Sequence, residues 1–149
     1  VTTRAVINEI EKGCADHPRL QDVLSLPWLR IVRVDEWKEI SLFAEYSRRL
    51  VVGEHHVGEA SVLAWAEAHE GVALIDDQAA VSCGRERKVK VVRTLALVAR
   101  GVRRHVMSGS GASALVDDLV MAGARFPCTG DQFERWAKDK GLLGETGSH

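Results

Sequence analysis

Two adjacent carboxylates follow a short apolar run near the middle of the chain. Asp76 and Asp77 come directly after residues 72–75, which read Val-Ala-Leu-Ile. A continuous apolar run of this length is typical of a buried parallel strand, and functional groups gather where such strands end. Adjacent like charges repel each other, and a bound cation is the usual way to offset that repulsion. The pair therefore predicts a cation site, although an aspartate at this place is equally typical of a helix cap.

Two more acids stand where they could join the pair. Glu59 follows Gly58 and opens an alanine-rich segment with helical spacing, and Glu9 falls between the apolar residues Val6 and Ile10 of the first helical segment. Each has an ordinary interpretation as well. A glutamate is favourable near the positive N-terminus of a helix, and Glu9 could simply face solvent. No single acid indicates a cation site by itself. Only the order of the acids along the chain supports a shared site.

Helical and strand patterns alternate along the chain and must position these acids. A first helix begins after Thr2 or Thr3 and ends at Gly13. This alternation predicts an α/β fold, a three-layer α/β/α sandwich around a mostly parallel sheet. It is expected to form a single domain over residues 1–143. Further helices are predicted over residues 19–25, 37–50, 59–69, 78–87, 94–102, 112–122 and 131–140, and strands over residues 28–34, 72–75 and 89–92.

Four stretches taken together resemble the PIN domain, and in particular a bacterial and archaeal PIN-like group related to VapC-type toxins. The resemblance extends over nearly the whole chain, from Val1 to Leu143. The matching stretches are Ala-Val-Ile-Asn-Glu at 5–9, Gly-Glu-Ala-Ser-Val-Leu-Ala-Trp-Ala at 58–66, Ala-Leu-Ile-Asp-Asp at 73–77 and Arg-Thr-Leu-Ala-Leu-Val at 93–98.

The resemblance implies a metal-dependent endoribonuclease. By matched position, Glu9, Glu59, Asp76 and Asp77 would be the catalytic carboxylates and would hold Mg²⁺ or Mn²⁺, and Thr94 would be a supporting hydroxyl. The metal would orient a water molecule and offset charge on the transition state. The resemblance further implies an RNA substrate, a homodimer and, for a toxin of a toxin–antitoxin pair, an antitoxin protein as partner.

Three departures from the family pattern support a second hypothesis. A PIN domain opens with a central strand that carries an aspartate, and we expect this strand to lie outside the printed sequence or in another polypeptide. Val81 stands where the group usually has an arginine after the Asp-Asp pair, and Arg93 stands where it usually has a glycine. The alternative to an enzyme is therefore a non-catalytic PIN-like module that binds RNA or a protein.

Composition limits the remaining function classes. The formal net charge of the 149 residues is −1 at pH 7, which does not suggest a general nucleic-acid binder with a basic excess. No apolar stretch approaches the roughly 18 residues that cross a bilayer. The three scattered cysteines build neither a disulfide framework nor a local metal motif, so a reducing, cytoplasmic setting is expected. We interpret residues 147–149 as the start of a purification tag, within a tail of residues 144–149.

Three smaller features have competing interpretations. The basic run that contains Arg85, Arg87 and Lys88 could contact RNA phosphates or form a solvated helix end. His55 and His56, just before Gly58, could add to a metal site or be exposed loop residues. The four tryptophans are scattered without a stacking platform, so we expect them in the core.

Overall fold

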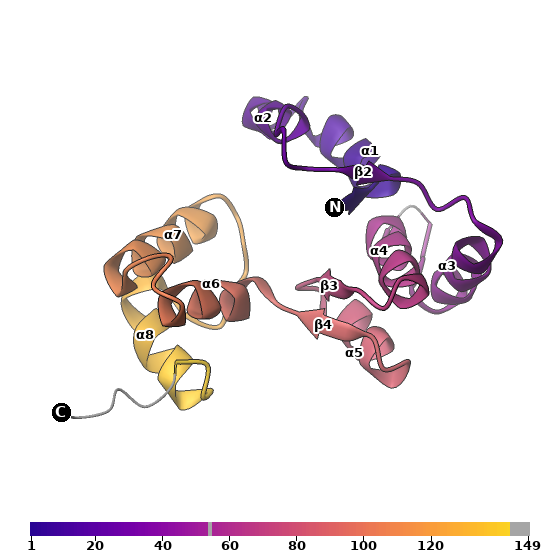
Figure 1. Ribbon diagram of the computed structural model, residues 1–149. Coiled ribbons are helices and arrows are strands. Elements are labelled where there is room, and N and C mark those ends of the chain that lie inside the picture. Colours follow the sequence, from indigo (N-terminus) through magenta and orange to yellow (C-terminus); the bar gives the residue numbers. More distant parts are fainter. Residues whose placement is uncertain (54, 144–149) are drawn as a thin grey trace. The chain divides into compact units, whose positions relative to one another are not determined.

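The computed structural model describes residues 1–53 and 55–143, which form two compact units (Figure 1). The first unit is Val1–Val91 and the second is Val92–His149. The predicted single domain over residues 1–143 stays a prediction, and the expected tag remnant at residues 144–149 lies outside the described residues. Of the helices in the described residues, none is long and apolar enough to cross a membrane.

The strands found in the described residues form two short sheets, one within the first unit and one whose last strand, β4, ends at Val92, the first residue of the second unit. β1 and β2 pair in parallel, with Thr2 opposite Ile31 and Thr3 opposite Val32, while β3 and β4 form a second two-stranded sheet. The α/β prediction is confirmed, with the strands divided between two sheets. The strands are β1 (Thr2–Thr3), β2 (Ile31–Val32), β3 (Val72–Leu74) and β4 (Lys90–Val92), and the helices of the first unit are α1 (Arg4–Gly13), the 3₁₀ turn η1 (Pro18–Leu20), α2 (Gln21–Leu24), α3 (Trp37–Leu50), α4 (Val57–Ala68) and α5 (Gln78–Glu86).

The core of the first unit lies between α3, α4 and α5. Its largest fully buried side chains include Tyr46, Leu63 and Val81. Alanines at 60, 64 and 66 are buried along α4, and their small size allows neighbouring helices to approach closely. An added Cβ at Gly84 would lie 2.7 Å from Leu63 Cδ2, so α5 also depends on a small residue where it meets α4.

A chain of buried hydroxyls joins α1 to α4 and so sets the position of Glu9. Thr3 caps α1 by accepting a hydrogen bond from the Val6 amide, and its Oγ1 lies 2.6 Å from Ser61 Oγ. Because the single Ser61 hydroxyl hydrogen is donated to the Gly58 carbonyl oxygen at 2.7 Å, Thr3 must be the donor to Ser61. The first turn of α1 is therefore tied to the first turn of α4.

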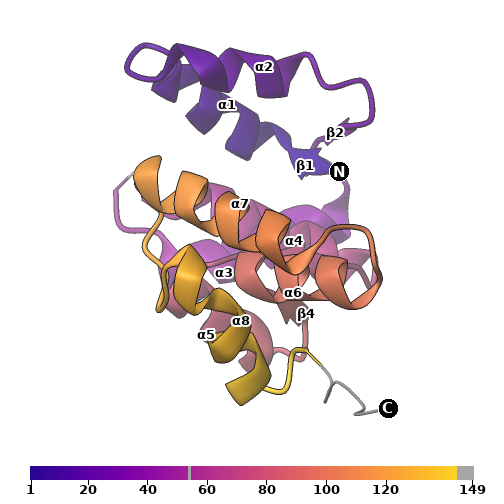
Figure 2. The same cartoon turned by 90° about the vertical axis from the view of Figure 1, so that its left-hand side faces the viewer.

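The second unit is helical, and Figure 2 shows α7 and α8 lying side by side in it. Its core contains Leu95, Val116 and Phe133. Helix α7 begins at Gly109, three residues before the predicted start, because the Ser108 hydroxyl accepts a hydrogen bond from the Gly111 amide and caps the helix. The helices are α6 (Thr94–Arg103), α7 (Gly109–Met121) and α8 (Gly130–Asp139).

Two sequence expectations about the first unit are wrong in detail. The strand predicted over residues 28–34 is reduced to Ile31–Val32, since residues 27 and 28 form a turn. Trp28 and Trp37, expected in the core, are 72% and 83% exposed. Trp37 is the first residue of α3, and the buried residues of this helix begin only at Glu39. Trp65, in contrast, is half-buried and stacks on His69.

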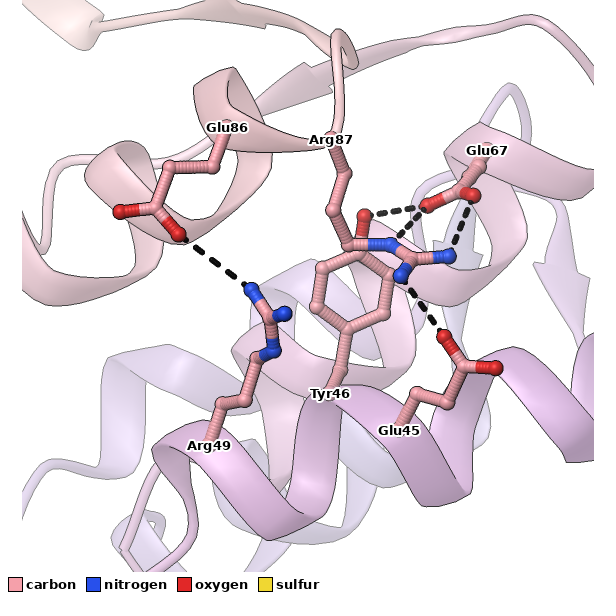
Figure 3. A network of polar contacts seen from close by, with 6 residues as sticks. All are labelled: Glu45, Tyr46, Arg49, Glu67, Glu86 and Arg87. Carbon is pink, nitrogen blue, oxygen red and sulfur yellow. Dashed lines mark hydrogen bonds and ion pairs between the residues drawn. The ribbon is translucent and has the colours of Figure 1, made fainter.

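A partly buried ion network holds α3, α4 and α5 together (Figure 3). The Arg87 guanidinium donates to both carboxylate oxygens of Glu67, at 2.8 and 2.7 Å, and pairs with Glu45 at 2.7 Å. The Tyr46 hydroxyl donates to Glu67 at 2.5 Å. The hydrogen bonds from Arg87 lower the pKa of Glu67, outweighing the effect of burial. Burial and the neighbouring Glu67 raise the pKa of Tyr46.

The network yields a prediction about acid stability. Glu67→Gln should lower the free energy of unfolding at pH 7 by about 1–3 kcal/mol, because it leaves Arg87 and Tyr46 incompletely paired. Since the pKa of Glu67 is lowered in the folded state, its contribution is present at neutral pH and is lost as the pH falls below the ordinary value of about 4.3. Urea unfolding at pH 7 and pH 3 should therefore show a difference between wild type and variant that shrinks in acid.

The matched control is the exposed ion pair in the same network. Glu86→Gln removes the partner of Arg49, a pair at 3.3 Å in which both side chains are more than half exposed. It should change the free energy of unfolding by no more than about 0.5 kcal/mol. Equal losses for the two variants would contradict a special role for Glu67.

Candidate metal centre

Glu9 is held against the start of α4 by a backbone hydrogen bond. The Gly58 amide donates to Glu9 Oε1 at 2.9 Å, across a sequence separation of 49 residues. An added Cβ at Gly58 would lie 2.6 Å from Glu9 Oε2 and 3.0 Å from Oε1. The carboxylate therefore occupies the space that any side chain at position 58 would fill, and glycine is required there for close approach.

Glu59 and Asp77 lie on either side of His56. The Nδ1 atom of His56 is 3.9 Å from Glu59 Oε1 and 3.9 Å from Asp77 Oδ1. Glu59 Oε1 and Asp77 Oδ1 can therefore be no farther apart than twice 3.9 Å. Asp77 Oδ1 also accepts a hydrogen bond from the Ala80 amide at 2.8 Å and caps α5. Asp77 is therefore a helix cap, which is one of the two interpretations that the sequence allowed. It nevertheless lies on the other side of His56 from Glu59.

A pocket of about 220 Å³ is lined by Glu9, Glu59 and Asp76. These acids come from α1, from the first turn of α4 and from the residues that follow β3. The rest of the lining is Gly58 with the apolar residues Val6, Val62, Leu74 and Ile75, so no described lining residue is a lysine or arginine. Three carboxylates line one pocket, and carboxylate oxygens attract cations.

The chemistry of this donor set fits a divalent ion. Mg²⁺ and Mn²⁺ prefer carboxylate and water oxygens, and the glycine at 58 leaves space for the Glu9 carboxylate. In their described positions, however, no three histidine, cysteine, aspartate or glutamate side chains of residues 1–53 and 55–143 are grouped so that they could hold a metal ion. The acids share a pocket but do not yet enclose a common point, so binding would have to draw them closer.

The other residues considered from the sequence are not among those that line this pocket. Thr94 is the first residue of α6, in the second unit, and its supporting role stays a prediction. Of the three cations considered for RNA contact, Arg85 and Lys88 are exposed. Arg87 is instead bound by Glu45 and Glu67, so it serves the network of Figure 3 and is not a freely exposed cation.

The sequence left two interpretations open for His56, an addition to a metal site or an exposed loop residue, and the structure places it beside Glu59 and Asp77. Its backbone is left-handed, with φ 64° and ψ 16°, immediately before α4. Its side chain is 32% exposed, yet its Nδ1 atom is buried. The sequence signals were its position three residues before Glu59 and its residue type, since histidine adopts a left-handed backbone more often than most residues other than glycine. The neighbouring His55 is exposed, as a loop histidine is expected to be.

Comparisons with known proteins agree with the geometry. A family model described as PIN domain matches residues 1–129, a stretch that includes every residue of the pocket. PIN domains are nuclease-type modules that interact with nucleic acids and generally use divalent metal ions. A search of the curated proteins and a search of the solved structures each found no match. Because the family model covers most of its residues, this chain belongs to the PIN-domain family.

Proposed function

We propose that this chain is a metal-dependent endoribonuclease of the PIN type. The observation that carries the proposal is the pocket lined by Glu9, Glu59 and Asp76, which come from three distant stretches of the chain. With Asp77, these residues would hold Mg²⁺ or Mn²⁺. When bound, such an ion orients a water molecule and offsets the negative charge that develops on the phosphate.

The chain's own residues have separable tasks in this proposal. The Gly58 amide fixes one oxygen of Glu9 and leaves the other oxygen for the ion. Asp77 keeps the start of α5 in place through the Ala80 amide, which holds the residues after β3 at the pocket. The exposed cations Arg85 and Lys88 are the candidates for phosphate contact. The carboxylates repel RNA phosphates, and the bound ion would offset that repulsion at the site of cleavage.

The wider setting follows from the resemblance of this chain to VapC-type toxins. We propose RNA as the substrate, a homodimer as the assembly and the cytoplasm as the location. A role as the toxin of a toxin–antitoxin pair, with an antitoxin protein as partner, belongs to the same proposal.

One observation favours a second candidate function, a non-catalytic module that binds RNA or a protein. Within the described residues, the carboxylates do not converge as they stand, and Val81 replaces the arginine usual after the Asp-Asp pair. Such a module would bind single-stranded RNA in the presence of a chelator and would not cleave it. The enzyme would cleave the same RNA only when Mn²⁺ or Mg²⁺ is added.

The first test removes individual carboxylates. Glu59→Gln and Asp76→Asn should each reduce Mn²⁺-dependent cleavage of single-stranded RNA by about 100-fold or more, since a lost ligand weakens both the ion and its effect on the phosphate. Cleavage of a labelled RNA across a Mn²⁺ titration measures this. Glu11→Gln is the control, because it removes an exposed carboxylate from the same helix as Glu9. Undiminished cleavage by Glu59→Gln would overturn the proposal.

The second test moves a carboxylate without removing it. In Gly58→Ala, the new Cβ would displace the Glu9 carboxylate, so cleavage should fall by about 10-fold or more. The fold should survive, because alanine favours a helix by about 1 kcal/mol over glycine and the displaced group is the flexible end of a side chain. Initial cleavage rates at saturating Mn²⁺, with circular dichroism as the check on folding, measure the effect.

Gly71→Ala is the matched control for this substitution. Gly71 follows the other end of α4, and its added Cβ would meet its nearest neighbours at 3.6 Å, an ordinary contact. This variant should cleave RNA like the wild type. If Gly58→Ala also retained full activity, the position of Glu9 would not matter to the reaction.

A further inference from the structure

The cations of this chain are concentrated in one stretch of its sequence. The 149 residues carry 20 lysines and arginines against 21 aspartates and glutamates, so the two signs nearly balance overall. Between Glu86 and Asp117, however, the sequence has seven lysines and arginines and no acid. A stretch with one sign of charge produces a local potential that the net charge of −1 does not reveal. What this stretch can bind depends on which of its cations are exposed and unpaired.

Three arginines of this stretch lie together on the solvent side of α6. The helix packs into the core of the second unit through residues that include Leu95 and Val98. Arg100, Arg103 and Arg104 are exposed. Residues three and four positions apart are neighbours on the surface of a helix, so Arg100 lies beside both of the others. These three side chains are called the α6 arginine cluster below.

No acid neutralises the α6 arginine cluster within residues 1–53 and 55–143. Elsewhere in the chain, Arg49 is paired with Glu86, and Arg87 with Glu45 and Glu67. The ion pairs and side-chain hydrogen bonds of the described residues include none of the three guanidinium groups on α6. Like charges three or four positions apart on a helix repel each other. An anion that bound across the cluster would offset this repulsion.

The end of α6 does not use the donors of the cluster. Cations are favoured near a helix C-terminus because the last carbonyl groups carry partial negative charge. Here the backbone itself closes the helix. The His105 amide donates to the Val102 carbonyl oxygen and the Val106 amide to the Gly101 carbonyl oxygen, both at 2.9 Å, and His105 has φ 57°. This pair of bonds is a Schellman motif, which requires no side-chain donor, so the guanidinium groups stay available to a ligand.

The residue type and spacing of the cluster fit a chain of phosphates. A guanidinium group is planar and donates two parallel hydrogen bonds to one phosphate, which a lysine ammonium cannot do. Arg100 and Arg104 are about 6 Å apart along the helix axis, at 1.5 Å per residue. A nucleic-acid strand carries one negative charge per nucleotide. The two arginines can therefore contact different phosphates of the same strand.

The surroundings of the cluster fit a protein partner less well. The centre of a protein interface is depleted in charged residues and depends on large apolar anchors. A helix that a protein recognises presents several such anchors on one face. Every residue of α6 is described, and Leu97, which is 47% exposed, is the single large apolar side chain that this helix exposes. Charge, and not apolar area, therefore dominates this surface.

We propose that the α6 arginine cluster is a docking surface for the phosphate backbone of single-stranded RNA. This inference rests on the proposed function, because that function supplies RNA as the ligand. It goes further by assigning affinity to the second unit, whereas Arg85 and Lys88 belong to the first. None of the three arginines lines the acidic pocket. Phosphate contacts position a nucleic acid without reading its sequence, so the cluster sets affinity and does not select the bond that is cut.

The experiment measures RNA binding separately from cleavage, in the whole 149-residue chain. Fluorescence anisotropy of a labelled oligouridylate, in a chelator and over a series of KCl concentrations, gives the affinity and its salt dependence. The variant carries Arg100→Gln, Arg103→Gln and Arg104→Gln, and circular dichroism checks its folding. Its affinity at low salt should fall by about 10-fold or more. The slope of log affinity against log salt should fall by about 2, because each phosphate contact on a single strand contributes about 0.7.

The matched control removes the same amount of charge from scattered positions. Arg19→Gln, Arg30→Gln and Arg48→Gln change three exposed arginines of the first unit that are not neighbours on one helix. This triple variant should keep the salt slope of the wild type. A second variant that replaces the cluster with three lysines should keep most of the slope, because the charge is retained. A labelled polyglutamate peptide, titrated in parallel, is the probe for an acidic protein segment.

The outcomes separate this inference from the proposed function. A loss of affinity and slope that is confined to the glutamine variant of the cluster supports the inference. Equal losses in the two glutamine variants overturn it, since affinity would then follow net charge alone, and so does unchanged RNA binding by the cluster variant. Loss of polyglutamate binding with unchanged RNA binding would assign the cluster to an acidic protein instead.

Mn²⁺-dependent cleavage by the wild type decides the proposed function independently. RNA that is bound through the cluster and never cleaved refutes the enzyme and supports the inference. Cleavage by the wild type, combined with unchanged RNA binding in the cluster variant, supports the enzyme and refutes the inference.

Discussion

The candidate site depends on a missing side chain, because the glycine at position 58 leaves the space beside the start of α4 that the Glu9 carboxylate occupies. The hydroxyls of Thr3 and Ser61 set the approach of α1 to α4, since the first donates to the second and the second donates to the Gly58 carbonyl. The Gly58 amide then reaches Glu9 Oε1 at 2.9 Å. Two residues separated by 49 positions are joined here by hydrogen bonds that leave room for nothing larger than a hydrogen atom. The position of the first acid of the pocket follows from this one contact.

The carboxylates of the first unit fall into two groups that differ in their neighbours. Glu67 is bound by Arg87, and buried Glu39 lies 2.6 Å from the His69 ring. Burial raises the pKa of Glu39, but the hydrogen bonds from His69 and from the Glu36 and Asp35 amides outweigh it and lower the pKa overall. Glu9, Glu59 and Asp76 instead line a pocket whose described lining includes no lysine or arginine. The first group is paired within the fold, and the second group lines the pocket of the proposed metal site.

The sequence was sufficient to predict most helices but not the contacts of individual side chains, and the roles of the acids stay a prediction. Helix α3 has the predicted bounds, Trp37–Leu50, because apolar residues repeat along one face. Trp37 was nevertheless misplaced, since a large apolar residue before that face has nothing to pack against. Arg87 looked like its basic neighbours Arg85 and Lys88, and only the packing of α3 against α4 and α5 directs it to Glu67. The left-handed backbone of His56 was not predicted, because histidine favours this conformation too weakly for its residue type alone to select the position.

The open arrangement of the acids is itself a consequence of their charge. Carboxylates that share a pocket repel each other and lower that repulsion by staying apart, which agrees with the finding that no three donors of the described residues enclose a common point. The backbone nevertheless brings their starting positions together, through the Gly58 amide at Glu9 and the α5 cap at Asp77. Backbone hydrogen bonds therefore fix the positions of Glu9 and Asp77, and in the proposed function the charge of the ion would offset the repulsion between the side chains. A pocket built in this way favours a divalent ion over a monovalent one, because the gain from each carboxylate increases with the charge of the ion.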